Sequence, residues 1–164
     1  MKKFLLFIGI NLSNSLFAHG FDGSGWLHPI TGIDHMVAMI AVGAWSAQLG
    51  NKAIFIVPGA FACCMLIGGI FGFEKIPIQG TETGIMLSVI FLGASIALEK
   101  KITIIIAALG VGIFGFCYGY AHGLEIPEST SKFEYAFGFI SATIGLHIIG
   151  AVGGLIILKH PDPD

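Results

Sequence analysis

Long apolar runs separated by short polar breaks constrain this chain more than any other feature. Five runs follow residue 19, at about 28–49, 53–73, 83–98, 102–121 and 133–158. A helix that crosses a bilayer needs roughly 20 apolar residues; four runs reach that length, and charges closely bracket the shorter third run. Only 11% of the residues are charged, against about 25% in a soluble domain. We therefore predict an all-α integral membrane protein, a bundle of five transmembrane helices in one domain over residues 19–164.

The first eighteen residues have the pattern of a cleaved signal peptide. Lys2 and Lys3 form a basic start, residues 4–10 an apolar core, and residues 11–18 a polar end with small residues. This pattern is too short for a complete membrane span and predicts cleavage after Ala18. An uncleaved anchor is the alternative. After cleavage the chain would begin at His19, whose imidazole and free amine could chelate a metal, although a disordered stub fits the same residues.

The lysines are unevenly distributed between the two sets of loops. If the mature N-terminus lies outside, the inner loops carry four lysines and the outer loops carry two among many acidic residues. Loops rich in lysine and arginine remain in the cytoplasm. We therefore predict an outside N-terminus and a cytoplasmic C-terminus. The chain has no arginine, and its net charge is −2, so no basic surface for nucleic acid is expected.

Small residues recur at the spacing that lets helices approach closely. Gly68/Gly72, Gly115/Gly119 and Gly150/Gly154 are GxxxG pairs, and we interpret these three as packing positions within the bundle. The three cysteines lie inside apolar runs and form no CxxC motif. We interpret them as small packing residues as well.

The first mature run opens with polar residues that can bind a metal. It begins His28-Pro29 and continues to Asp34-His35. Pro29 suits a first helical turn, and on one continuous helix His28 and His35 would share nearly one face, about 10 Å apart along the axis. An Asp-His pair inside an apolar helix is costly unless it is paired or ligating. The alternative is that Asp34 caps or bridges helices.

Two further histidines belong to other runs. His122 lies at the outer end of the fourth run, three residues before Glu125, and His147 lies deep in the fifth. A lone helical histidine is usually a packing residue, but four with two carboxylates from three helices predict a metal path. Imidazole with carboxylate suits nickel, cobalt, zinc or iron. The absence of a thiolate cluster argues against a copper(I) or zinc-thiolate site. Glu82, at the outer start of the third run, fits either a contributing charge or a solvated helix end.

These motifs resemble the HupE/UreJ family of nickel and cobalt permeases. The resemblance rests on HPxxGxDHxxxM from His28 to Met39, Ala121-His122-Gly123-x-Glu125, and Ala142-Thr143-x-x-Leu146-His147. It covers essentially the whole mature chain. It implies import of Ni²⁺ or Co²⁺ as substrate through the bacterial inner membrane, without a prosthetic group, for hydrogenase or urease maturation. By position it implies metal-site roles for His28, Asp34, His35, His122, Glu125 and His147.

Two departures from the family pattern modify this expectation. Tyr118 and Tyr120 stand where family members often carry histidines, which would remove ligands at the outer mouth and lower the affinity or change the metal preference. Family members also usually continue past the region of Lys159 into a sixth helix. We therefore expect five mature spans; either the last helix is dispensable, or this protein is degenerate, or a partner completes the bundle.

Three classes of function compete at this stage. The favoured one is a permease that is not an enzyme; the absence of a P-loop motif excludes ATP hydrolysis by that route, so the ion would move down a gradient or depend on a separate subunit. The second is a non-transporting metal sensor or assembly factor. The third is an intramembrane metalloenzyme, disfavoured because the sequence has no HExxH motif and no nucleophile-elbow serine. The choice between nickel and cobalt and the existence of a homo-oligomer stay open.

Overall fold

The computed structural model describes residues 32–99, 102–127 and 129–157, and over these residues the fold is built from helices and their connections. The helices are α3 (Ile33–Leu49), α4 (Ala53–Phe73), α5 (Thr81–Leu98), α6 (Ile104–Leu124) and α7 (Lys132–Ile157). Helices α4 to α7 are each long and apolar enough to cross a membrane, whereas α3 has 17 residues. The predicted all-helical bundle is thereby confirmed, and four of its five predicted spans are long and apolar enough to cross a membrane among the described residues. The predicted signal peptide at 1–18 lies outside the described residues.

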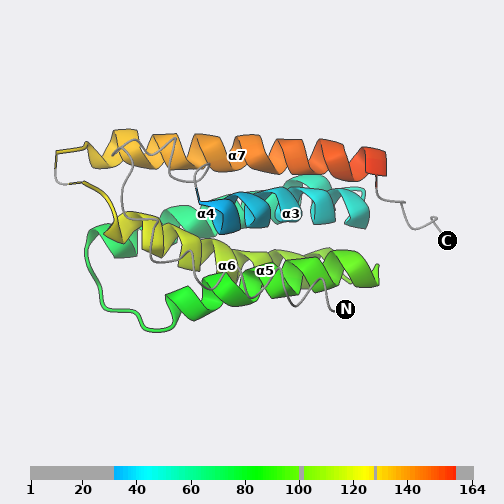
Figure 1. The fold of residues 1–164 in the computed structure, drawn as a ribbon, viewed down its shortest axis with the longest axis horizontal. Helices are drawn as coiled ribbons and strands as arrows, with labels where there is room; N and C mark the ends of the chain where they lie inside the picture. The colour runs from blue at the N-terminus through cyan, green and yellow to red at the C-terminus, as the bar shows by residue number, and fades with distance from the viewer. Residues whose placement is uncertain (1–31, 100–101, 128, 158–164) are drawn as a thin grey trace.

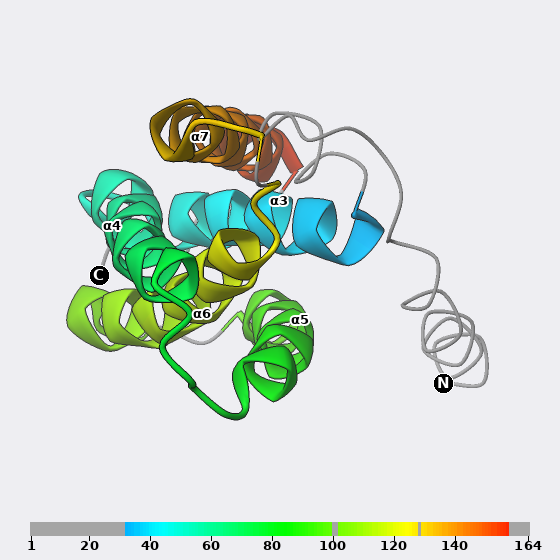
Figure 2. The same ribbon diagram turned by 90° about the vertical axis from the view of Figure 1, so that its left-hand side faces the viewer.

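The helices run roughly along the long axis of the molecule, as Figure 1 shows. The α4–α5 and α6–α7 connections lie together at one end, on the left of Figure 1, where Glu74, Glu82, Glu125 and Glu134 are found. We call this the acidic end. In Figure 2, α3 passes between α7 and α6, so its side chains meet several neighbours.

Helix α3 begins well inside the bundle rather than level with the acidic end (Figure 1). Gly32 precedes it with extended backbone, at φ −76° and ψ 102°, and its carbonyl accepts the first helical hydrogen bond from Met36 at 2.8 Å. Glycine is a weak helix former that is well tolerated at this capping position. The predicted helix from residue 28 is therefore interrupted at Gly32. The prediction that His28 and His35 share a face stays untested, because His28 lies outside the described residues.

Glycines bring two helix pairs into backbone contact. In the α4–α6 pair a side chain at Gly68 would collide with the Phe116 carbonyl, and one at Gly119 with the Met65 carbonyl. In the α3–α7 pair a side chain at Gly150 would collide with the Ile40 carbonyl. The three predicted GxxxG pairs all lie on these interfaces, because only residues without Cβ atoms let the backbones approach this closely.

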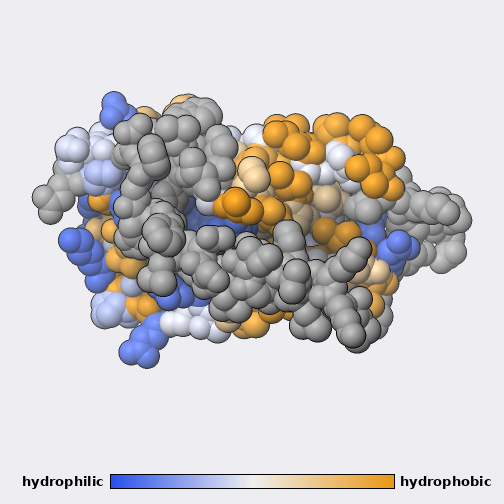
Figure 3. All heavy atoms as spheres, in the orientation of Figure 1, coloured by the Kyte–Doolittle hydropathy of each residue, from blue (hydrophilic) through white to orange (hydrophobic). Residues whose placement is uncertain are grey.

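Helix α5 lies at the periphery, since only Ser88 and Leu92 of this helix are buried. The Gln48 side-chain amide on α3 donates a hydrogen bond to the Ile96 carbonyl at 3.1 Å and helps to hold α5 in place. Large apolar side chains elsewhere face outward, including Phe55 at 80% and Ile156 at 77% exposure. Figure 3 shows hydrophobic side chains gathered over the C-terminal part of α7, on the right, and most of the visible hydrophilic residues on the left. This distribution is typical of a protein surrounded by lipid.

Candidate metal centre

Two histidines from different helices meet inside the bundle. His35 lies in the first turn of α3, and His122 lies in the last turn of α6. Their ring centroids are 5.2 Å apart with the planes at 89°. His122 is fully buried, and His35 is half-buried. A first-row metal ion lies about 2.1 Å from an imidazole nitrogen, and the separation of the two rings is compatible with both binding one ion.

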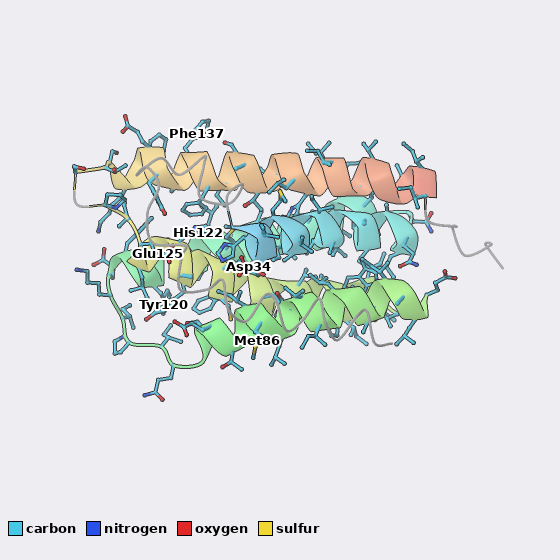
Figure 4. All side chains as sticks on the ribbon, viewed as in Figure 1. Asp34, Met86, Tyr120, His122, Glu125 and Phe137 are labelled. Atoms are coloured by element: carbon cyan, nitrogen blue, oxygen red, sulfur yellow. The ribbon has the colours of Figure 1, made fainter. Side chains whose placement is uncertain are left out.

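Asp34 supplies a carboxylate next to this histidine pair. It directly precedes His35 in the first turn of α3 and is exposed, and Figure 4 shows it at a level along the bundle similar to that of His122. The positive end of the helix dipole stabilises a carboxylate at this position, which lowers the cost expected for an acidic residue in an apolar helix. Asp34 is also close enough to Tyr118 to act electrostatically on its hydroxyl group.

Aromatic rings hold the two imidazoles in place. The His122 ring stacks on Phe139 of α7, with centroids 5.1 Å apart and planes at 7°. The His35 ring meets Tyr118 of α6 edge-on, with centroids 4.8 Å apart. Phe139 and Tyr118 are both fully buried. The orientation of each imidazole is therefore set by tertiary packing from another helix.

A hydrogen bond connects Tyr118 to the peripheral helix α5. The hydroxyls of Tyr118 and Ser88 are 3.0 Å apart, and the Ser88 hydroxyl donates to the Ile85 carbonyl at 2.6 Å. Because serine has one hydroxyl proton, Tyr118 is the donor to Ser88. From the sequence, Tyr118 was interpreted as a lost ligand and Ser88 was given no site role, although Ser88 is a polar residue in an apolar run and matches the family pattern.

Tyr120 has a different partner. Its hydroxyl donates to the Ile76 carbonyl at 2.8 Å and accepts from the Ile78 amide at 3.1 Å. It therefore ties the α4–α5 connection to α6 at the acidic end. We predicted that two tyrosines replace histidines of the family pattern. Of these, Tyr118 lies beside His35 and Tyr120 anchors a loop.

His147 lies apart from the pair, farther along α7. It follows Lys132 by fifteen residues, which places it about 22 Å along the helix. Its ring is 3% exposed and meets Phe61 of α4 at 5.2 Å and 85°. Its Nε2 atom has no hydrogen-bond partner among the described residues. One turn earlier, the Thr143 hydroxyl donates to the Met65 sulfur at 3.6 Å.

Glu125 and Glu82 lie at the acidic end of the bundle, with Glu125 one helical turn after His122. Glu125 directly follows α6 and is exposed, and its carboxylate is close enough to act electrostatically on Tyr135. Glu82 is exposed in the first turn of α5. The exposed Lys132 ammonium pairs with Glu74 at 3.1 Å at the same end. Negative charge therefore collects at the acidic end of the bundle.

The predicted metal residues are thus distributed along the bundle. Within the described ranges, no three His, Cys, Asp or Glu side chains are grouped closely enough to hold a metal ion. The structure brings His35 and His122 together next to Asp34, and it places Glu125 and His147 on either side of them along the bundle. His19 and His28 lie outside the described residues.

Comparison with known proteins identifies the family. The family model described as HupE / UreJ protein matches residues 8–163. The chain is also similar to Protein HupE of Rhizobium leguminosarum bv. viciae, with 44% identity over 131 residues that cover 79% of this chain and 69% of that protein. No solved structure matches. Because the family match spans nearly the whole chain and the identity is high, this protein belongs to the HupE/UreJ family.

Proposed function

We propose that this protein is a permease that imports a divalent transition metal ion, nickel with cobalt as the competing ion, across the bacterial inner membrane. The observation that carries the proposal is the meeting of His35 and His122 beside Asp34 inside an apolar bundle. Membership in a family associated with nickel and cobalt transport for hydrogenase and urease supports it. The ion is the substrate of the protein, and hydrogenase or urease maturation proteins are the partners expected to receive it.

The donor set suits an ion that must bind and then leave. Imidazole and carboxylate are ligands that Ni²⁺ and Co²⁺ accept readily. Two imidazoles and one carboxylate form a small set, which leaves coordination positions for water or for a residue such as His28. Conduction requires binding that is strong enough for entry and weak enough for release, and a complete ligand cage would retain the ion.

The order of the polar residues along the bundle supports a direction of transport. The acidic end carries Glu125, the histidine pair lies deeper, and His147 lies deeper again. In the proposed orientation the acidic end faces outside, where its carboxylates attract cations. The ion passes from Glu125 to the pair and then to His147, and leaves toward the lysine-bearing cytoplasmic face.

The test is metal uptake by cells that lack their own nickel and cobalt importers. We expect uptake by the wild type and its loss in His35→Ala and Asp34→Asn, with equal membrane levels of each protein. Glu99→Gln is the matched control, because it removes an exposed carboxylate at the C-terminal end of α5, away from both the acidic end and the pair. It should leave uptake within about twofold of the wild type, as expected when a screened surface charge is removed.

Two results would contradict the proposal. Full uptake by His35→Ala would remove the pair from the path. No uptake of either ion by a well-inserted wild type would favour the sensor or assembly-factor function, and metal binding without flux in purified protein would then support that class.

A further inference from the structure

Phe61 of α4 contacts both halves of the polar path. Its ring centroid is 5.8 Å from that of Tyr118, which meets His35, and 5.2 Å from that of His147. Its side chain is fully buried. The described ring contacts that link the histidine pair to His147 therefore run through Tyr118 and then through Phe61.

The depth of Phe61 agrees with a position between the two sites. It precedes Phe73, at the acidic end of α4, by twelve residues, or about 18 Å along the helix. His147 lies about 22 Å along α7 from the same end. Tyr118 lies only six residues from the end of α6, or about 9 Å. An ion moving inward would meet Tyr118 first, then Phe61 and then His147.

The backbone around Phe61 has little freedom to move. A side chain at Gly115 of α6 would collide with the Phe61 carbonyl, so α4 and α6 are in direct backbone contact at this level. A shift of the whole helix would have to break this packing. Rotation of the phenyl ring about its side-chain bonds disturbs much less, and rings in packed interiors change rotamer without separating the helices.

We propose that Phe61 is the internal barrier of the permeation path and determines which ions pass. This inference rests on the proposed function and adds a residue to it. The ring separates an ion at the His35–His122 pair from the His147 Nε2 atom, which has no hydrogen-bond partner within the described part of the chain. Hydrophobic constrictions of this kind block hydrated ions. An ion that exchanges water for imidazole can pass when the ring turns, whereas Mg²⁺ gives up its water reluctantly.

The experiment uses the full-length protein in liposomes that contain a metal-sensitive dye, with Ni²⁺ and Mg²⁺ as the two probes. The variants are Phe61→Leu, Phe61→Ala and Phe61→Trp. Phe71→Ala is the matched control, because Phe71 is a partly buried phenylalanine of the same helix that packs on Phe116 at 5.6 Å. Protein insertion is measured for each variant, and Phe61→Leu decides the outcome if Phe61→Ala does not insert.

We expect Phe61→Leu and Phe61→Ala to raise the initial Ni²⁺ rate by about tenfold, the effect of lowering a barrier by ~1.4 kcal/mol, and to admit Mg²⁺. Phe61→Trp should lower the Ni²⁺ rate by about tenfold, because the larger ring raises the barrier by a similar amount. Phe71→Ala should transport Ni²⁺ at the wild-type rate. If Phe61→Leu has the wild-type rates and selectivity, the proposed barrier role of Phe61 is wrong, while the proposed permease function is unaffected. Slower transport in both Phe61→Leu and Phe61→Trp would make Phe61 a packing residue. A well-inserted wild type that carries no Ni²⁺ would overturn both proposals.

Discussion

Replacement of Gly119 by alanine tests whether the α4–α6 backbone contact supports the metal site. The added methyl carbon would collide with the Met65 carbonyl oxygen and lie 2.6 Å from its carbonyl carbon and 2.8 Å from its Cα. Ordinary contacts begin near 3.4 Å, so the helices must separate locally by 3.4 − 2.6 = 0.8 Å or more. Backbone atoms cannot rotate away as a side-chain tip can. We therefore expect a loss of about 3 kcal/mol in stability, the upper part of the range for overpacking.

The consequence should reach the histidine pair. Gly119 follows Tyr118, whose ring meets His35 and whose hydroxyl donates to Ser88. Separation of α6 from α4 would move this ring, so metal uptake should fall together with stability. The assay is heat-induced unfolding of the purified protein in detergent, combined with nickel uptake by cells at equal membrane levels.

Gly59→Ala is the control for this substitution. A methyl group at Gly59 of α4 meets no atom within 4 Å, and alanine in a helix is more favourable than glycine by about 0.5–1 kcal/mol. This variant should unfold at the wild-type temperature or slightly above it. A Gly119→Ala protein as stable and active as Gly59→Ala would refute the reasoning that close backbone contact positions the site.

Two further predictions concern the metal ligands. Imidazole binds a metal only when it is neutral, and its ordinary pKa is about 6.5. Metal uptake should therefore be full above that external pH and should fall as the pH drops through it. Undiminished uptake at pH 5 would count against histidine ligation. Tyr118→His would place a third imidazole at a ring position 4.8 Å from His35, so the KM for nickel uptake should fall by about tenfold, the effect of ~1.4 kcal/mol of added binding. An unchanged KM in this variant would indicate that the ion does not approach position 118.

The positions of the helices were predictable because they depend on local composition. An apolar run of sufficient length must form a helix in a bilayer, where backbone groups find no water, and the observed helices closely follow the predicted runs. The exception is the start of α3. There the Gly32 backbone is extended, which a count of apolar residues does not detect.

The site was predictable only in part. His35, Asp34 and His122 stood out because polar groups are costly in an apolar segment, and the structure brings them together. Phe61 and Phe139 gave no such signal, since one phenylalanine among fourteen is indistinguishable from lipid-facing residues in the sequence. Their importance comes from the rings that they touch.

The sequence by itself determined that this is a helical membrane protein, which segments form its helices, and which residue types carry its chemistry. Each of these properties depends on the free energy of transferring a short segment from water to lipid, which is a sum over the residues of that segment. Only the tertiary structure decided that α4 pairs with α6 and α3 with α7, and that His35 meets His122 while His147 lies beyond Phe61. Helix pairing in lipid depends on the fit of two distant surfaces, and one helix's sequence does not specify its partner.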